Sequence, residues 1–370
     1  MTRFSELLLV AAAAALVTTA APAGAEVRIG FAAALTGPMA WAGAGSEQGA
    51  EFGVADLNAR GGVLGEQIEL ITADDYCEGE QAVAAAHKLV AAAVVAVVGH
   101  QCSGAAIRAS EIYSQAGLLM ISTFATNPKL TEQGFTNVFR VVGRDDLQGR
   151  IAGDLLTERW GNRPIAILHD GQAFGKRLAE ETSKRLNDRG ITAAMFEAIE
   201  PGKADYWDIV QKMRAMGVEV LYYGGYKYEA GLIIRQAREH GYQLNLVGGD
   251  GIGGEDFGLV AGSASDGTLM TAPPVPSGPE AAELAWKFTE KSQNTFTAYA
   301  ALQAWAQAVE MVGTFETEAV AKSLRAQKFD TVLGRIGFDH KGDVTGYDTF
   351  VWYVWKDGKY EPADPAELTD

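Results

Sequence analysis

Two turns that carry hydroxyl groups, residues 100–104 and 122–128, contain side chains suited to binding a carboxylate. Ser103 stands where an apolar run gives way to a helical pattern, and Thr126 follows another apolar run. Exposed N–H groups and the helix dipole make a helix N-terminus attractive to anions. Ser103 could equally be an ordinary helix N-cap, and Thr126 an ordinary turn residue. The residues alone leave both interpretations open.

A second set of candidates lies in glycine-rich segments and suits an ammonium group. Tyr226 ends the run Tyr-Tyr-Gly-Gly-Tyr, and Asp250 supplies the one carboxylate within residues 246–254. Small residues allow a ligand to approach the backbone, and a carboxylate beside an aromatic face attracts a cation. An Asp-Gly pair is also common in plain turns. If these segments face the carboxylate-binding turns, the ligand they predict is a zwitterion.

Residue patterns typical of enzymes and metal sites are missing from the sequence. The five His residues show no metal-binding spacing and no HExxH motif, and no GxSxG nucleophile motif occurs. Asp74 and Asp75 are adjacent at the end of an expected strand, where we predict a solvated loop. We therefore expect no enzymatic activity, no metal and no cofactor. An exported enzyme with an unfamiliar site is the alternative.

Short β-rich runs alternate with helical runs along the chain and would position these candidates. Strands are expected at residues 27–33, 67–72, 93–99, 118–122, 164–169, 191–198, 218–223 and 244–248. Helices are expected at residues 46–60, 81–92, 103–115, 173–189, 206–216, 228–240 and 300–312. This alternation predicts an α/β fold with two Rossmann-like lobes and parallel-type sheets, with the ligand site beyond the carboxyl ends of the strands. Residues 268–276 are expected to be a stiff, proline-rich crossing segment.

The N-terminal residues and the composition point to an exported protein. Residues 1–25 combine a charged start, a short apolar run and a small-x-small ending, which predicts a cleaved signal peptide. The net charge of −16 argues against nucleic acid as a partner, because phosphate binding needs a basic surface. In an oxidising compartment, Cys77 and Cys102 favour one disulfide over two buried free thiols.

Six short motifs in one order carry a resemblance to a known family. They are residues 35–38, 56–62, 98–103, 121–128, 222–226 and 338–343. The chain resembles the periplasmic leucine/isoleucine/valine-binding proteins, the type I solute-binding proteins of amino-acid ABC transporters. The resemblance implies a periplasmic binding protein type I fold with a three-crossing hinge. One lobe is expected from residues 26–144 and 273–338, and the other from residues 145–272 and 339–370.

The resemblance also implies roles for individual residues. Ser103 is expected to bind the ligand carboxylate through its hydroxyl and amide, and Thr126 to contact both charged groups. The backbone carbonyl of Phe124 and the carboxylate of Asp250 are expected to accept from the ammonium, with Asp250 in a place that is commonly Glu. Tyr226 is expected to pack on the ligand. The family's disulfide corresponds to Cys77–Cys102.

Several positions depart from the family pattern. Gln101 stands where branched-chain binders carry an apolar residue, and Phe124 replaces a small one. Trp41 is nearest to the family's aromatic lid, with Ala42 at the matching place. Residues 273–297 are shorter than usual, and Phe296 is the candidate for the aromatic wall of the side-chain pocket. The bulkier, more polar wall predicts a small or polar amino acid, or a compact analogue such as a short ω-amino acid, rather than leucine.

The expected function follows from the export signal and the resemblance. The chain is predicted to be a monomeric periplasmic protein that captures a free amino acid between two lobes and delivers it to an ABC transporter permease in the inner membrane. The alternative is a ligand-sensing protein of the same fold that presents its closed form to a receptor or regulator.

Overall fold

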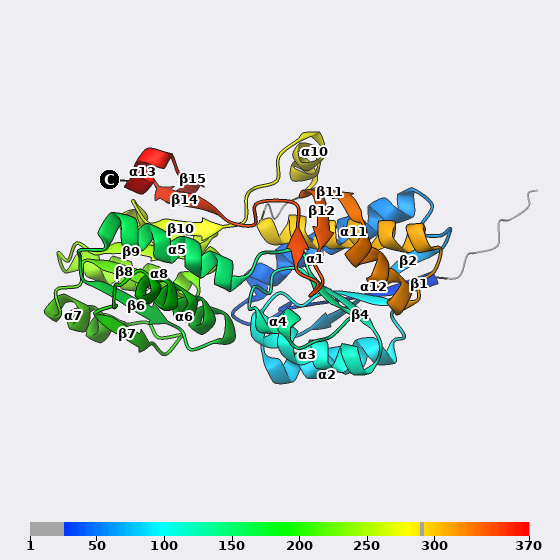
Figure 1. Ribbon diagram of the computed structural model, residues 1–370, viewed down its shortest axis with the longest axis horizontal. Coiled ribbons are helices and arrows are strands. Elements are labelled where there is room, and N and C mark those ends of the chain that lie inside the picture. The colour runs from blue at the N-terminus through cyan, green and yellow to red at the C-terminus, as the bar shows by residue number, and fades with distance from the viewer. Residues whose placement is uncertain (1–25, 289–291, 370) are drawn as a thin grey trace, which may run out of the picture.

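The computed structural model describes residues 26–288 and 292–369, which form two α/β lobes side by side (Figure 1). The predicted signal peptide, residues 1–25, lies outside the described residues. Within the described part of the chain, no helix is both long and apolar enough to span a membrane.

The first lobe is built on a five-stranded parallel sheet in the order β2-β1-β3-β4-β5. Its strands are β1 (Glu26–Ala33), β2 (Gln67–Asp74), β3 (Ala96–Gly99), β4 (Leu119–Ser122) and β5 (Val138–Arg140). Its helices are α1 (Ala40–Ala59), α2 (Gly79–Ala91), α3 (Ser103–Gln115), α4 (Lys129–Glu132), α10 (Pro279–Lys287), α11 (Gln293–Val312) and α12 (Thr317–Ala326). A small antiparallel sheet of β11 (Lys328–Thr331), β12 (Gly334–Phe338) and β13 (Val344–Thr345) packs beside α11 and α12.

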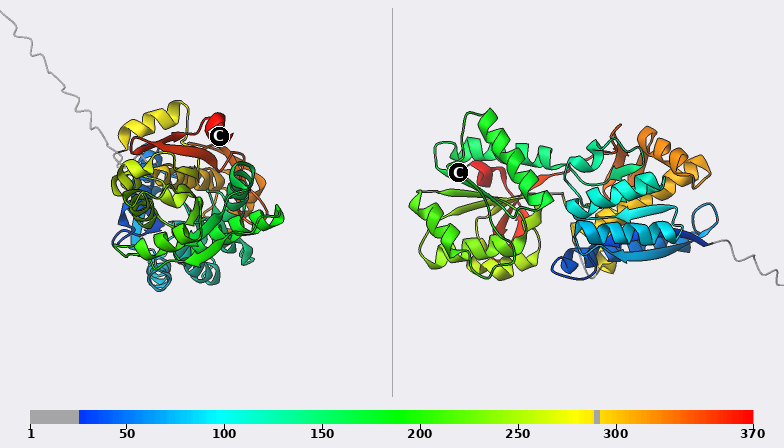
Figure 2. Two further views of the ribbon diagram at one scale, coloured as in Figure 1. Left: turned by 90° about the vertical axis from the view of Figure 1, so that its left-hand side faces the viewer. Right: turned by 90° about the horizontal axis from the view of Figure 1, so that it is seen from below.

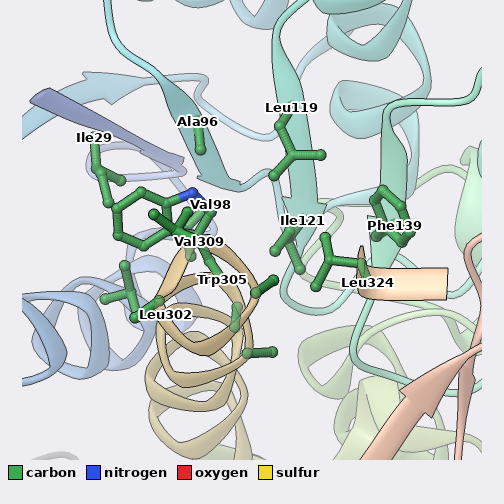
Figure 3. Close-up of a cluster of buried hydrophobic side chains, with 14 of the residues drawn as sticks. Ile29, Ala96, Val98, Leu119, Ile121, Phe139, Leu302, Trp305, Val309 and Leu324 are labelled. Atoms are coloured by element: carbon green, nitrogen blue, oxygen red, sulfur yellow. The ribbon is translucent and has the colours of Figure 1, made fainter. Parts of the chain in front are cut away.

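Both faces of this sheet are covered, so its central strands β3 and β4 are apolar almost throughout. Val98 and Ile121 point into the core shared with α1 and α11, where Trp305 of α11 is almost fully buried (Figure 3). Val97 and Met120, one residue away along the same strands, point into the opposite core beneath α2 and α3. This alternation is the pattern of a strand buried on both faces.

The second lobe is built on a seven-stranded sheet in the order β15-β14-β10-β9-β8-β6-β7. Its strands are β6 (Ile165–His169), β7 (Met195–Ala198), β8 (Val220–Gly224), β9 (Asn245–Gly248), β10 (Leu269–Ala272), β14 (Val351–Lys356) and β15 (Lys359–Pro362). Its helices are α5 (Asp145–Trp160), α6 (Ala173–Asp188), α7 (Trp207–Ala215), α8 (Lys227–Glu239), α9 (Glu255–Ala261) and α13 (Pro365–Thr369). The strands β6 to β10 run parallel, whereas β14 and β15 are antiparallel additions.

Two expectations from the sequence are wrong here. Residues 268–272 are not a crossing segment, because β10 pairs with β9 and β14 and is buried along its length. The prolines that suggested a crossing follow the strand instead of interrupting it. The helix expected from residue 46 begins earlier, at Ala40. Its glycines Gly43 and Gly49 allow close packing: a Cβ at Gly49 would lie 2.0 Å from the carbonyl oxygen of Thr295 in α11.

The chain passes between the lobes three times, after β5, after β10 and after β13, and the right-hand view of Figure 2 shows connecting segments between the two lobes. The third passage was expected at residue 339 but lies beyond Thr345, because β13 still pairs with β12. A turn centred on Asp339 makes this pairing possible. Its carboxylate accepts from the amides of Lys341, Gly342 and Asp343.

Candidate ligand-binding site

A cleft of about 810 Å³ lies between the lobes and receives side chains from both. The seven residues predicted from the sequence to bind ligand all line it: Trp41, Gln101, Ser103, Phe124, Thr126, Tyr226 and Asp250. They come from the N-terminal ends of α1, α3 and α8 and from the loops after β3, β4, β8 and β9. The carboxyl ends of the parallel strands therefore bring together residues that are up to about two hundred positions apart.

The first lobe forms one wall of the cleft, which contains Ser103 and Thr126 and which we call the hydroxyl wall. Ser103 is the first residue of α3, and its Oγ accepts a hydrogen bond from the backbone N–H of Asn127 at 3.2 Å. The ordinary N-cap role does not describe this geometry, since Cys102 occupies the cap position. The bond joins the two turns that were predicted to cooperate, and the first-turn amides of α3 stand beside them.

Arg140 supports the hydroxyl wall from behind, and sequence reasoning missed it. Its fully buried guanidinium donates through Nη1 to the carbonyl oxygens of Ala125 and Asn127, at 2.8 and 3.0 Å. These carbonyls flank Thr126, so the guanidinium fixes the turn that presents the threonine. A signal was available, because Arg140 interrupts the apolar run 138–142 and a buried arginine requires acceptors.

Asp343 is the acidic partner of Arg140 and reaches the site from the far end of the chain. Its Oδ1 accepts from Arg140 Nε at 2.6 Å, and its Oδ2 accepts from Arg144 Nη1 at 2.7 Å. Burial would raise the pKa of Asp343, but the charge of Arg140 and the hydrogen bond from Arg144 hold it below the usual value. The motif at residues 338–343 therefore serves the site by delivering this carboxylate.

The predicted disulfide between Cys77 and Cys102 is formed and joins the loop after β2 to the start of α3. Asp75, expected in a solvated loop, is instead fully buried. Its Oδ2 lies 2.6 Å from Nδ1 of His100, and its Oδ1 accepts from the amide of Cys77 at 2.8 Å. That expectation is wrong because the loop folds inward around the disulfide, so that Asp75 bonds to the segment that leads to Ser103.

Asp250 lies in the opposite wall, formed by the second lobe, which we call the carboxylate wall. It follows β9 in a short 3-10 turn, and its Oδ1 accepts from Nε2 of Gln148 at 3.0 Å. Among the described residues, its buried Oδ2 has no hydrogen-bond partner. Burial raises the pKa of Asp250 to about 6, against the opposing effect of the bond from Gln148. The carboxylate is therefore held in place with one oxygen left to accept from a ligand.

The glycines beside Asp250 allow two loops of the second lobe to pack closely. A Cβ at Gly251 would lie 2.3 Å from the carbonyl oxygen of Gly225, so only glycine lets the two loops approach. The neighbouring Tyr226 is partly buried, with its ring 5.4 Å from that of Phe174. The glycine-rich pattern thus brings the tyrosine and the carboxylate to one wall.

A further buried acid, Asp145, lies where the two walls meet and was not predicted. Its backbone N–H donates to the carbonyl oxygen of Thr126 at 3.0 Å. Burial raises the pKa of Asp145 well above its usual value, opposed by the hydroxyl of Thr126, and the negative charge of Asp250 raises it further. A cationic ligand group near Asp250 would therefore enter a region that is short of positive charge.

The family model described as periplasmic binding protein matches residues 26–359 of this chain. The chain belongs to the periplasmic binding protein family. Leu/Ile/Val-binding protein homolog 1 of Brucella suis is 40% identical over 357 residues, which cover 94% of this chain and 96% of that protein. The leucine-, isoleucine-, valine-, threonine-, and alanine-binding protein of Pseudomonas aeruginosa is 38% identical, with coverage of 89% and 90%.

Solved structures show the same fold as this periplasmic binding protein. The leucine binding protein LivK of Thermotoga maritima superposes with a TM-score of 0.82 at 23% identity, over 91% of this chain and 98% of that chain. The substrate-binding protein LivJ of Streptococcus pneumoniae, solved with isoleucine, gives a TM-score of 0.79 at 26% identity, with the same coverage. The predicted family and the predicted periplasmic binding protein type I fold are confirmed.

The aromatic wall of this family member differs from the expectation. Phe296 does not line the cleft, because its ring packs against Phe288 beneath α10, 5.4 Å between centroids. Trp355 and Tyr360, from β14 and β15, border the cleft on the side of the second lobe, where Trp355 is fully buried with its ring 4.7 Å from that of Phe257. Neither residue was assigned to the site from the sequence. Across the described residues, no group of three or more His, Cys, Asp or Glu side chains is arranged to hold a metal ion.

Proposed function

We propose that this chain is a periplasmic solute-binding protein that captures a free amino acid between its lobes and delivers it to an ABC permease in the inner membrane. The observation that carries the proposal is the pairing across one cleft of the buried Asp250 carboxylate with Ser103 at the N-terminus of α3. The first suits an ammonium and the second a carboxylate. The names of the relatives and the signal peptide predicted at residues 1–25 support the same function.

Five of the lining residues have proposed roles in holding the ligand. Ser103 and the first-turn amides of α3 bind the ligand carboxylate, and Thr126 contacts both charged groups. Asp250 accepts from the ammonium together with the backbone carbonyl of Phe124, and Tyr226 packs against the ligand. A ligand that bridges both walls stabilises the closed arrangement of the lobes, because each lobe alone offers only half of the contacts.

The proposed ligand is at the small or polar end of the range that the relatives' names cover. Gln101 is 6% exposed, and among the described residues its buried Oε1 has no hydrogen-bond partner. Placing a leucine side chain against that oxygen would leave it unsatisfied, at a cost of about 1–3 kcal/mol. Phe124 lines the cleft, and a phenylalanine in place of the family's small residue removes volume that a branched side chain would use. Alanine and threonine, both in the name of the Pseudomonas relative, fit these constraints.

Calorimetric titration of purified, refolded and ligand-free protein tests the proposal. We expect leucine and isoleucine to bind at least about tenfold more weakly than the better of alanine and threonine, which corresponds to about 1.4 kcal/mol. Gln101→Leu is the matched variant, since it removes the unsatisfied oxygen and should narrow that gap. Leucine as the tightest ligand of the unmodified protein would contradict the proposed preference. Loss of amino-acid uptake on gene deletion would support transport, whereas intact uptake would favour the sensing alternative.

A further inference from the structure

Trp41 and Lys227 meet across the cleft, each from a different lobe. Trp41 lies at the start of α1, which packs against α11 in the first lobe. Lys227 is the first residue of α8, directly after the loop that follows β8 in the second lobe. The Nζ of Lys227 lies 3.2 Å from the centroid of the Trp41 ring. An ammonium group therefore rests on an aromatic face that belongs to the opposite lobe.

The second lobe holds Lys227 in position for this contact. The residue is 6% exposed, and its Nζ forms an ion pair with Oδ2 of Asp256 in α9 at 2.5 Å. Gly254 leaves room for the ammonium, since a Cβ there would lie 3.3 Å from Nζ. The ion pair fixes the position of the ammonium, although the side chain of Asp256 is itself 53% exposed. A cation that lies over a tryptophan face is attracted to the ring.

We infer that Trp41 and Lys227 form a latch between the lobes that slows release of the bound amino acid. The inference rests on the proposed function, because it assumes that the lobes close around a ligand. Any opening of the cleft separates the ring from the ammonium, so the contact stabilises the closed form alone. A contact of this kind changes the closed-to-open ratio by the same factor for every ligand. Trp41 then acts on the partner lobe, and does not select the ligand side chain as an aromatic lid would.

Dissociation rates measured by stopped-flow tryptophan fluorescence test the latch. Lys227→Met keeps the length of the side chain and removes its charge, and should speed the release of alanine and of leucine by the same factor, about three- to tenfold. Lys227→Arg keeps a cation over the ring and should restore slow release. Lys212→Met, on α7 and outside the lining of the cleft, is the control for the loss of one positive charge. The double variant Lys227→Met with Trp41→Leu should release ligand no faster than the faster of the two corresponding single variants.

Unchanged dissociation in Lys227→Met would overturn the latch. So would acceleration factors that differ between alanine and leucine by more than their experimental error, because Trp41 would then contact the ligand side chain. Binding of neither amino acid by the unmodified protein would refute the proposed function by itself. The latch would then be judged from spin-label distances between the lobes of the ligand-free protein. Lys227→Met should shift them to longer values, and an identical distribution would overturn the latch.

Discussion

The two walls of the cleft present different chemical groups to a ligand, and different contacts hold these groups in place. The hydroxyl wall presents uncharged groups, and it is fixed by a disulfide, a buried arginine and a hydrogen bond from Asn127 to Ser103. The carboxylate wall presents the charge of Asp250, held by one side-chain amide from Gln148. Backbone amides and hydroxyls act only at hydrogen-bond distance and in the right direction, so they need rigid support. A carboxylate acts over a longer distance, and its requirement is to stay buried and ionised.

The largest effect should come from removing the support of the hydroxyl wall. Arg140→Met should lower the free energy of unfolding by about 3–5 kcal/mol, because the buried Asp343 would lose one of its two arginine partners and the carbonyls of Ala125 and Asn127 would lose their donor. Urea denaturation followed by circular dichroism measures this. The double variant Arg140→Met with Asp343→Leu should recover part of the loss, since it removes the carboxylate that has lost its closer partner. A double variant no more stable than the single one would show that the ion pair is not the cause.

Removing the charge of the other wall should affect binding more than stability. Asp250→Asn keeps the shape and the acceptor for Gln148, but an ammonium ligand would lose its acidic partner. We expect calorimetry to show a loss of binding free energy of about 2–5 kcal/mol. Thermal unfolding of the ligand-free variant should occur at the same or a higher temperature, because a buried charge has been removed. Binding equal to that of the unmodified protein would show that Asp250 does not contact the ammonium.

The pKa of about 6 for Asp250 predicts pH-dependent binding. Burial raises this pKa, so the ligand-free protein takes up a proton at Asp250 below about pH 6, and an ammonium ligand requires the ionised form. Affinity should be constant above pH 7 and fall with decreasing pH, by about tenfold per unit once the pH is well below 6. Calorimetry between pH 5 and pH 8 checks this. The Asp250→Asn variant should lack this decrease, and a flat profile in the unmodified protein would contradict the prediction.

The smallest of these effects is expected at Ser103. Ser103→Ala removes one hydroxyl, but the first-turn amides and the dipole of α3 remain available to the ligand carboxylate. Calorimetry should show a loss of about 1 kcal/mol. A loss as large as that of Asp250→Asn would mean that the hydroxyl, and not the helix terminus, dominates carboxylate binding.

The lining residues could be found from the sequence because parallel sheets expose the carboxyl ends of their strands. Ser103, Thr126 and Asp250 each follow an apolar run that is recognisable as a strand. The supporting residues could not be paired in the same way. Arg140 and Asp343 are 203 positions apart, and Gln148 and Asp250 are 102 apart. No local pattern records such contacts, because they exist only after distant segments of the chain have folded together.

The sequence predictions that the structure contradicts failed for local reasons. The prolines after β10 masked a buried strand, since proline stiffness suggests a crossing but says nothing of the residues before it. Phe296 was taken for a lining aromatic because of its position in the chain, although it lies on the buried face of α11. Trp355 and Tyr360 went unnoticed because antiparallel strands added to the sheet edge follow no rule for strand ends.

The central claim is that the cleft binds a zwitterion with one charged group on each wall. Calorimetric titration of the ligand-free protein with alanine, alaninamide and N-acetylalanine tests it, because each analogue removes one charge. Both analogues should bind more weakly than alanine, and N-acetylalanine should lose the more, on the order of thirtyfold or greater, since it cannot satisfy Asp250. N-acetylalanine binding as tightly as alanine would contradict the account.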